Sequence, residues 1–371
     1  MGQKEYYRAA FLTGDREIVL GSLQIPDLGT KDVLIRIHRA NLCPTDLKKY
    51  YHLDEKSLRA IKDQGGVILG HEASGIVEKV GADVTDIKPG MRVAIDPMLP
   101  CGTCDYCKEG DYPLCENLKG VGVSAGSVQD SIDLLNHGIG GTFADFVKVP
   151  DVNVYPLPSG LSLEAGAMME PLADVLHSLE VGAPQRDETV VVFGLGAMGL
   201  MHVKVMNYWG IKRIIGVDPL AQRRMKAEEF GAMMTIDPKV DDPIETLKKF
   251  TGGLGPELLF ICAGGVAQKV CAQQAFQAVR KKGRIMLYAS AIKPADISID
   301  INHIHYGMIT LTGTVGFYRQ HAVKALELLQ NGALDIDKIR TPSFPLEKLK
   351  EAFELTDHSE VIKVGVDIYD G

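Results

Sequence analysis

Four cysteines lie close together between residues 101 and 115, in the pattern Cys-x-x-Cys-x-x-Cys-x₇-Cys. Four thiolates on one short loop can close a tetrahedral shell around a zinc ion with no open position, which is typical of a structural site. A redox pair would account for only two of the thiols, and an iron–sulfur cluster is a second alternative. The spacing favours a structural zinc bound by Cys101, Cys104, Cys107 and Cys115.

A second group of metal-ligating residue types is scattered along the chain. Cys43 stands alone, His71 and Glu72 follow Gly70, and Glu170 lies in an apolar stretch. Neighbouring side chains in a regular strand point to opposite faces, so His71 and Glu72 can share one ion only if the backbone turns there. A lone cysteine is more often a small buried residue, whereas a buried carboxylate needs a partner. The residues alone leave open whether these groups share an ion.

A glycine motif follows directly after the apolar run 189–193: Gly194-Leu195-Gly196-Ala197-Met198-Gly199. The first glycine permits a tight turn, the second lets a pyrophosphate approach the backbone, and the third lets the following helix pack closely. The helix N-terminus then offers unpaired N–H groups to the phosphates. The motif and its context predict a dinucleotide site.

Asp218 ends the next apolar run, 213–217, and is placed to accept hydrogen bonds from a ribose 2′-hydroxyl. Its carboxylate would repel a 2′-phosphate, which favours NAD over NADP. Arg223 and Arg224 stand nearby and weaken that preference. We assign cofactor binding to Gly194, Gly196, Ala197, Met198, Gly199, Asp218 and Arg223.

Two different patterns of secondary structure position these residues. Residues 1 to about 155 are mostly β, with short strands separated by Gly, Pro and Asp turns and a long irregular loop at 121–141. From about residue 172 apolar strands alternate with helices, which predicts a doubly wound parallel sheet of the Rossmann kind. The expected strands are 33–37, 75–80, 92–95, 189–193, 213–217, 234–236, 258–262 and 284–288, and the expected helices are 198–209 and 321–329.

Length and composition narrow the class of protein. The 371 residues suit about two domains, and the net charge of −8 does not suit a nucleic-acid binder. The longest apolar run, 189–201, is too short for a membrane span, and the N-terminus lacks an apolar signal core. These features predict a cytoplasmic protein, in which seven cysteines serve metal binding or catalysis rather than disulfides. Cys262 and Cys271 are expected to be buried small residues.

Together these motifs resemble the zinc-containing medium-chain alcohol dehydrogenase family. The most specific stretch is Gly70-His71-Glu72-x-x-Gly75-x₅-Gly81-x-x-Val84, followed by the cysteine lobe, Glu170-Pro171-Leu172 and the motif at Gly194. The resemblance implies a GroES-like, mostly β catalytic domain over residues 1–171 and 311–371, with the zinc lobe at 101–115. A Rossmann coenzyme domain over 172–310 is inserted in it.

The resemblance also implies a second, catalytic zinc bound by Cys43 and His71, with Glu72 and Glu170 as carboxylate partners, so two zinc ions per chain. Zinc would lower the pKa of a substrate hydroxyl, and the resulting alkoxide would pass hydride to NAD. Thr45 occupies the family's proton-relay position. Glu170-Pro171-Leu172 resembles the sorbitol and threonine branch. This favours oxidation of a secondary hydroxyl of a polyol or sugar, with L-threonine or 2,3-butanediol as alternatives.

The chain departs from the family pattern in two places. Pro44 replaces the usual glycine, and Lys48 stands where a histidine often ends the proton relay. We hypothesise that Lys48 completes the relay or binds a ribose or an anionic substrate group; a solvated lysine is the alternative. The loop at 121–141 is longer than usual and is expected to shape the substrate pocket or an oligomer contact, with His137 more plausibly a solvated side chain than part of the pocket.

Two hypotheses from other classes compete with an enzyme. A non-catalytic redox sensor would keep both the metal and the nucleotide sites, but the ligand residues Cys43 and His71 favour turnover. An interaction protein built on the zinc lobe would tolerate Cys43→Ala. The expected partners are a small polar alcohol and further copies of the chain, with a tetramer favoured over a dimer, and neither nucleic acid nor a membrane.

Overall fold

The computed structural model describes residues 5–292, 295–356 and 361–369, and these form two compact units. Unit 1 comprises residues 1–173 and 317–371, and unit 2 comprises 174–316. The sequence predicts boundaries at 171/172 and 310/311, a few residues from these divisions. The first division falls within helix α6 (Met169–Gly182).

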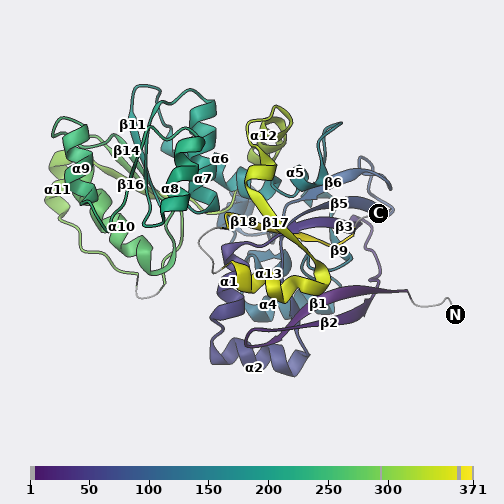
Figure 1. Cartoon of the computed structure of the whole chain (residues 1–371). Helices are drawn as coiled ribbons and strands as arrows, with labels where there is room; N and C mark the ends of the chain where they lie inside the picture. The colour runs from purple at the N-terminus through teal and green to yellow at the C-terminus, as the bar shows by residue number, and fades with distance from the viewer. Residues whose placement is uncertain (1–4, 293–294, 357–360, 370–371) are drawn as a thin grey trace. The chain divides into compact units, whose positions relative to one another are not determined.

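Unit 1 is built on β-sheets with helices at their edges (Figure 1). Its strands are β1 (Tyr6–Gly14), β2 (Glu17–Gln24), β3 (Asp32–Asn41), β4 (Val67–Ile68), β5 (Glu72–Val80), β6 (Arg92–Ile95), β7 (Met98–Leu99), β8 (Lys119–Gly120), β9 (Phe146–Pro150), β10 (Val154–Pro156), β17 (Arg340–Pro345) and β18 (Lys363–Asp367). Its α-helices, besides the start of α6, are α1 (Pro44–Tyr51), α2 (Glu55–Gln64), α3 (Asp105–Glu109), α4 (Val128–Asn136), α5 (Leu163–Gly166), α12 (Arg319–Gln330) and α13 (Leu349–Leu355). Its 3₁₀ turns are η1 (Tyr112–Leu114), η2 (Val121–Val123), η3 (Asp151–Asn153), η4 (Ile336–Lys338) and η5 (Leu346–Lys348).

Strand β3 is the centre of the largest sheet in unit 1, whose strand order is β10-β6-β5-β3-β18-β17 with β9 also paired to β3. Its apolar residues Leu34, Ile35 and Ile37 are fully buried. β5 and β18 flank β3 and pair antiparallel with it, opposite Asn41 at its end. This pairing brings the start of β5 near the start of β18, although the two strands are far apart in the sequence.

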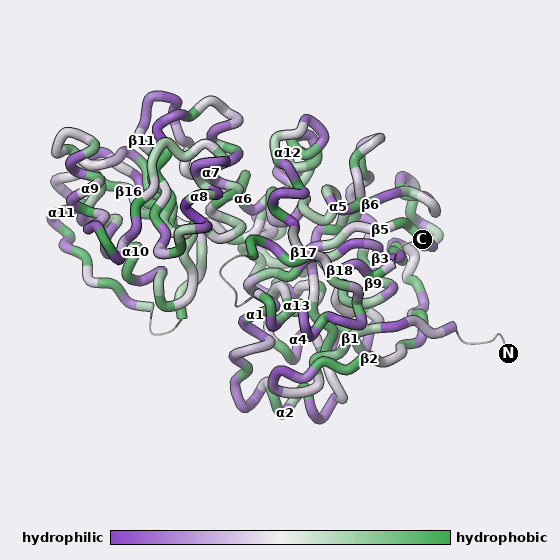
Figure 2. The backbone as a smooth tube through the Cα atoms, viewed as in Figure 1, coloured by the Kyte–Doolittle hydropathy of each residue, from purple (hydrophilic) through white to green (hydrophobic). Residues whose placement is uncertain are grey.

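Unit 2 contains a six-stranded sheet in the order β13-β12-β11-β14-β15-β16, and every pair in it is parallel. Its central strand β11 is buried along its whole length, because helices must cover both faces of a parallel sheet. Figure 2 shows the apolar path of β11. The strands are β11 (Thr189–Phe193), β12 (Arg213–Val217), β13 (Met234–Ile236), β14 (Leu258–Ile261), β15 (Arg284–Leu287) and β16 (Thr310–Gly313), and the helices are α7 (Ala197–Tyr208), α8 (Ala221–Glu229), α9 (Pro243–Phe250), α10 (Gly265–Ala278) and α11 (Ile301–Gly307).

The expected strands and helices are confirmed to within a few residues at their ends. The prediction of an irregular loop at 121–141 is wrong, because these residues form the helical turn η2 and the nine-residue helix α4. Ser127 caps α4 by accepting a hydrogen bond from the Asp130 amide, and Asp130 bonds back to the Ser127 amide. This reciprocal capping box is a helix-start signal that the sequence contained. The expected burial of Cys262 and Cys271 is also wrong, since both are half-buried.

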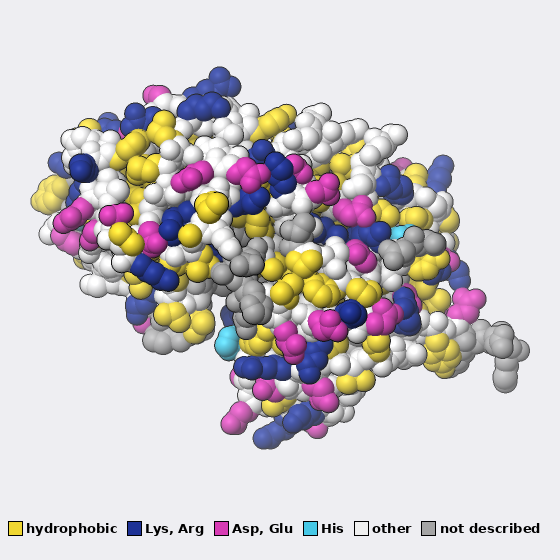
Figure 3. Space-filling model, in the orientation of Figure 1, with side chains coloured by type: hydrophobic (Ala, Val, Ile, Leu, Met, Phe, Trp, Pro, Cys, Tyr) yellow, Lys and Arg dark blue, Asp and Glu magenta, His cyan; other side chains and the backbone are white. Residues whose placement is uncertain are grey.

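The surface carries charges of both signs. Lys and Arg side chains are interspersed with Asp and Glu side chains over the face of the molecule shown in Figure 3. Within the described ranges, we find no helix with both the length and the apolar character required to span a bilayer.

Candidate active site and metal centres

A sharp backbone turn places His71 and Glu72 on the same site. Gly70 has a φ of +90°, and strand β5 begins only at Glu72, so His71 is not part of the strand's alternation. Potential ligand atoms of Cys43, His71 and Glu72 all lie within 4.8 Å of one another. His71 and Glu72 are buried, with exposed fractions of 2% and 0%, whereas Cys43 is half-buried. The turn that the sequence left open is therefore present, and ligand types from two segments, around residues 43 and 71–72, converge.

Helix α1 contributes the support for this cluster. Cys43 is its N-cap residue, and the Asp46 carboxylate accepts a hydrogen bond from the Cys43 amide (3.0 Å) through Oδ2. Through Oδ1 the same carboxylate accepts from the Gly70 amide (3.0 Å) and lies 3.4 Å from His71 Nδ1. One buried carboxylate thus ties together the two segments that supply a thiol and an imidazole. A carboxylate on one ring nitrogen orients the other nitrogen toward a metal.

Two functional residues were not predicted from the sequence. Asp46 is one, although its spacing of three residues from Cys43 is that of a capping pair. The other is Lys363, the first residue of β18. Lys363 Nζ donates to Glu72 Oε1 at 2.6 Å, and the two side chains are only 1% and 0% exposed. A lysine inside the apolar run Val361–Val366 is the one signal that could have drawn attention to it.

The burial and the charges of the cluster favour protonated forms of Cys43, His71 and Lys363. Desolvation raises the pKa of the Cys43 thiol, although His71 and Lys363 act against it. Burial alone would lower the pKa of His71, but Asp46 and Cys43 raise it by a larger amount, so the net shift of the pKa is upward. Burial likewise acts to lower the pKa of Lys363, and the charges of Glu72, Cys43 and Glu170 outweigh it. A thiol that resists ionisation and an imidazole that retains its proton are both converted to ligand forms by a bound metal.

An orphaned atom supports the same interpretation. Among the described residues no hydrogen-bond partner reaches Glu72 Oε2, although the atom is buried. A buried carboxylate oxygen without a partner is costly. A metal ion beside Cys43 and His71 would satisfy it, so the donor set of one sulfur, one imidazole and one carboxylate fits zinc.

The remaining predicted residues of the catalytic unit lie outside the group of three ligands. Glu170 is in the first turn of α6 and is not grouped with the three ligands, but it lies close enough to Lys363 to raise its pKa. Thr45, half-buried, and Lys48, exposed, are both on α1. His137 is the exposed C-terminal cap of α4.

The four-cysteine lobe forms a second, local cluster. Ligand atoms of Cys101, Cys104, Cys107 and Cys115 lie within 4.8 Å of one another, and Cys101 Sγ is 4.0 Å from Cys107 Sγ. Two thiolates on one tetrahedral zinc with bonds of about 2.3 Å would be separated by about 3.8 Å. The Thr103 hydroxyl and the Thr103 and Cys104 amides donate to Cys101 and lower its pKa to about 5. The lobe therefore has the geometry and a ready thiolate for a metal.

The glycine motif of unit 2 opens helix α7 after β11, as predicted. Gly196 is its N-cap, and a Cβ there would meet open space, whereas a Cβ at Gly199 would overlap the Gly194 carbonyl oxygen. Ala197 and Met198 are the first residues of the helix. The open approach at Gly196 suits a pyrophosphate at the helix N-terminus.

Asp218 follows β12 and is buried beside this turn. Its carboxylate accepts from the Leu195 amide (2.8 Å) and the Leu220 amide (2.9 Å). Arg223 Nη1 lies 3.8 Å from Asp218 Oδ2, whereas Arg224 is occupied by the Asp218 carbonyl and by Asp237. Of the two arginines named from the sequence, Arg223 is therefore the one that faces the carboxylate.

Comparison with known proteins decides the family. Residues 29–159 match the family model described as "Alcohol dehydrogenase GroES-like domain", and residues 197–331 match "Zinc-binding dehydrogenase". The chain is 32% identical to sorbitol dehydrogenase of Gallus gallus over 94% of this chain and 92% of that protein. The chain belongs to the zinc-containing medium-chain alcohol dehydrogenase family.

Two further relatives place this dehydrogenase in the sorbitol and threonine branch and define its fold. L-threonine 3-dehydrogenase of Pyrococcus furiosus is 31% identical, over 93% of each chain. A zinc-binding dehydrogenase from Sinorhizobium meliloti, solved with NADP bound, is 26% identical with a TM-score of 0.85, covering 98% of this chain and all of that one. The expected GroES-like and Rossmann folds are confirmed, and the zinc-dependent dehydrogenase class is confirmed with them.

Proposed function

We propose that this dehydrogenase oxidises a secondary hydroxyl of a polyol, a sugar or a sugar derivative to a ketone in the cytoplasm, with NAD as hydride acceptor. The observation that carries the proposal is the convergence of Cys43, His71 and Glu72 within 4.8 Å. A non-catalytic sensor would keep the same ligand set, so the turnover assay described below distinguishes it from an enzyme. The chain's likeness to sorbitol dehydrogenase supports the polyol class.

Cys43, His71 and Glu72 would hold the catalytic zinc, and Glu72 is the better candidate of the two glutamates because its Oε2 has no other described partner. Bound zinc would polarise the substrate hydroxyl, and NAD would accept the hydride. Asp46 orients His71, while Lys363 compensates the charge of Glu72. Glu170 stays a candidate for holding water or substrate near Lys363.

Helix α1 offers a path for the hydroxyl proton. Thr45 and Lys48 are three residues apart and so share one face of the helix. Thr45 is half-buried and Lys48 is exposed, so a proton passed to the Thr45 hydroxyl could leave toward water beside Lys48. We expect Lys48→Ala to change the pH dependence of kcat/KM or the affinity for substrate. Unchanged values for both would remove Lys48 from the mechanism.

The preference for NAD depends on Asp218. Its buried carboxylate follows β12, where a dinucleotide-binding fold would recognise the ribose, and a 2′-phosphate bound there would meet a like charge. Arg223 acts in the opposite sense, and a relative solved with NADP makes the test necessary. Steady-state kinetics with each cofactor should give a higher kcat/KM with NAD than with NADP. Asp218→Ala should reduce the ratio of these two kcat/KM values at least about tenfold. A wild-type preference for NADP would contradict this part of the proposal.

The substrate is tested with a panel of polyols, sugars, L-threonine and 2,3-butanediol, followed by the absorbance of reduced cofactor. The highest kcat/KM is expected for a polyol or sugar. L-threonine is the second candidate, because a threonine dehydrogenase is nearly as similar to the chain as a sorbitol dehydrogenase. The same preparation should contain two zinc ions per chain and run as a homo-oligomer, with a tetramer expected by light scattering. Absence of turnover across the panel, with both metals bound, would favour a non-catalytic sensor.

A further inference from the structure

The segment that contains helix α4 lies directly against the turn that carries His71. Residues 120–143, which we call the supporting segment, leave β8, form η2 and α4, and return alongside Leu69 and Gly70. The Thr142 amide donates to the Gly70 carbonyl (2.8 Å), and the Phe143 amide donates to the Leu69 carbonyl (3.1 Å). The returning end of the segment is thus hydrogen-bonded to the two residues before His71.

The outgoing end of the supporting segment touches the same turn even more closely. Gly122 has a φ of +63°, and a Cβ added to it would overlap the Gly70 carbonyl oxygen and lie 2.6 Å from the Gly70 carbonyl carbon. The contact is between two backbones, so a neighbouring side chain cannot relieve it by changing rotamer. Only glycine at 122 permits this approach.

The chain tolerates unfavourable features to make this contact. Val123 is a buried β-branched residue with a φ of +64°, a conformation that such residues rarely adopt. The Thr142 hydroxyl is buried, and no described group bonds to it. Strained backbone and unpaired polar atoms persist where the surrounding structure imposes them, often beside functional sites.

The Gly70 peptide groups are consequently fixed from two sides. The Gly70 amide donates to Asp46 Oδ1 at 3.0 Å, on the side of α1. The Gly70 carbonyl accepts from Thr142 and abuts Gly122, on the side of the supporting segment. His71 is the next residue, so the direction of its ring depends on both supports.

We propose that the supporting segment is a positioning element for the catalytic metal site, with Gly122 as its main positioning residue. The proposal rests on the proposed function, because it requires that His71 binds the metal. It assigns residues 120–143 to metal geometry rather than to a substrate pocket.

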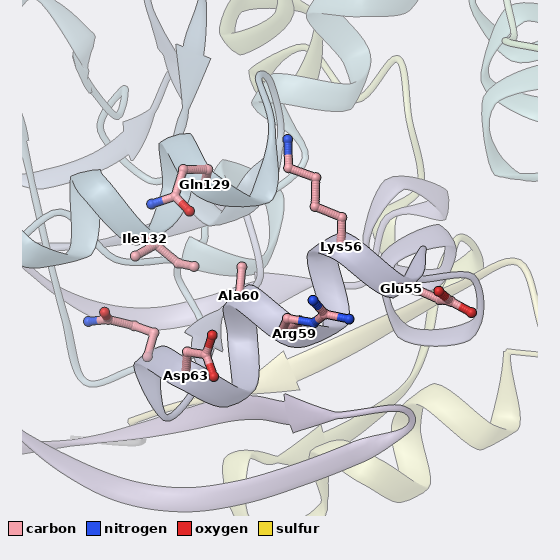
Figure 4. Close-up of a pocket in the computed structure, with 8 residues that line it drawn as sticks. Glu55, Lys56, Arg59, Ala60, Asp63, Gln129 and Ile132 are labelled. Atoms are coloured by element: carbon pink, nitrogen blue, oxygen red, sulfur yellow. The ribbon is translucent and has the colours of Figure 1, made fainter.

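The outer side of α4 is anchored away from the metal cluster. Gln64 of α2 donates to Asn136 at the end of α4 (2.8 Å). Helices α2 and α4 line a hollow of about 540 Å³. Figure 4 shows residues of its lining, with Lys56 and Arg59 on α2 and Gln129 and Ile132 on α4. None of the residues that line this hollow belongs to the metal cluster.

The test compares Gly122→Ala with Gly90→Ala in the zinc-loaded full-length protein. Gly90 has a φ of +85°, and a Cβ added there would meet open space, so the control shares the backbone strain of the substitution without the collision. Three quantities are measured: zinc release to a chromogenic chelator, amide exchange of the peptide containing Gly70 and His71, and kcat and KM with the best substrate.

We expect Gly122→Ala to release one of two zinc ions at least about tenfold faster, while the second ion is released as in the wild type. Exchange at Gly70 should accelerate, and kcat should fall about ten- to a hundredfold. Gly90→Ala should match the wild type in all three, whatever its melting temperature. Wild-type zinc release and kcat in a folded Gly122→Ala protein would overturn the proposal.

A milder variant covers the case in which Gly122→Ala does not fold. Ser127→Ala removes the cap of α4 and should accelerate both Gly70 exchange and release of the same single ion, by a smaller factor. Unchanged exchange and release in this variant would also overturn the proposal. If the wild type itself binds only the lobe ion, the proposed function fails instead, so the two failures are distinguishable.

Discussion

The two candidate metal centres of unit 1 are built in opposite ways. The lobe takes its four ligands from fifteen consecutive residues, and its thiolates are supported by amides and a hydroxyl of the same loop. The catalytic cluster takes its ligands from two separate segments, around residues 43 and 71–72, and its supports from Asp46 and Lys363. The lobe is therefore specified locally, whereas the catalytic cluster exists only once β3, α1, β5 and β18 are assembled.

This difference separates what each centre can contribute. A loop tied by a metal at its own ends gains stability from the metal. A cluster with fixed supports and a carboxylate oxygen without a described partner offers a coordination site that the fold has already shaped. We therefore expect the lobe to govern stability and the cluster to govern turnover, and the predictions below test that division.

The largest expected effect is on turnover. Cys43→Ala should lower kcat/KM at least about a thousandfold, because a bound zinc ion contributes several kcal/mol of charge stabilisation to such reactions. Metal analysis should then find one zinc per chain instead of two, and thermal unfolding should change little. Cys271→Ala, a half-buried cysteine outside both clusters, is the matched control and should retain activity. Equal metal content in Cys43→Ala and the wild type would contradict the division.

The next effect is on the metal-free protein. Lys363→Met leaves Glu72 as a buried charge with no cation, which should destabilise the apoprotein by about 3–5 kcal/mol in urea unfolding. The double variant Glu72→Gln with Lys363→Met should recover most of that loss. Lys79→Met, which breaks the exposed pair with Glu5, should cost less than about 1 kcal/mol. A Lys363→Met apoprotein as stable as the wild type would show that the pair does not matter for folding.

A substitution in the lobe should lower stability and leave turnover almost unchanged. Cys104→Ser should remove the lobe zinc and cost about 3 kcal/mol, the loop-closure value for a crosslink that spans roughly 15 residues. The folded fraction should keep its kcat to within about twofold, measured below the melting temperature. A thousandfold loss of kcat in the folded protein would mean that the lobe takes part in turnover.

The smallest effect is a pH dependence at the base of the lobe. Asp96 lies between β6 and β7, and burial raises its pKa to about 7, despite the opposing hydrogen bond from Met98 and the charge of Arg319. The native state then binds the proton more tightly than the unfolded state. The contribution of Asp96 to stability is thus fully present below about pH 4 and is lost as the pH rises toward 7.

The free energy of unfolding should therefore fall less between pH 5 and pH 8 in Asp96→Asn than in the wild type. The difference should be at least about 1 kcal/mol, measured by urea unfolding at both pH values. Asp54→Asn is the control with the opposite sign. The amide of Ser57 lowers the pKa of Asp54, so the wild-type carboxylate contributes stability that is lost on acidification. An identical pH dependence in Asp96→Asn and the wild type would contradict the assignment.

The same contrast explains how much could be predicted from sequence. The lobe, the glycine motif and the strands of unit 2 depend on local spacing, and the expected elements match the observed ones. The choice between Glu72 and Glu170 could not be made, because it depends on the turn at Gly70 and on Lys363. Lys363 pairs with Glu72 across 291 residues, a separation for which no periodicity or motif gives a signal. The helix α4 was missed although Ser127 and Asp130 form a recognisable cap.

The pairing of Glu72 with Lys363 has a consequence for biosynthesis. Ribosomes add roughly 5–20 residues per second, so the lysine follows the glutamate by about 15–60 s. During that interval unit 2 is synthesised, and the nascent chain contains an acidic group that β18 will later neutralise. A chain that stopped before β18 would contain the whole coenzyme unit but would lack the lysine that pairs with Glu72.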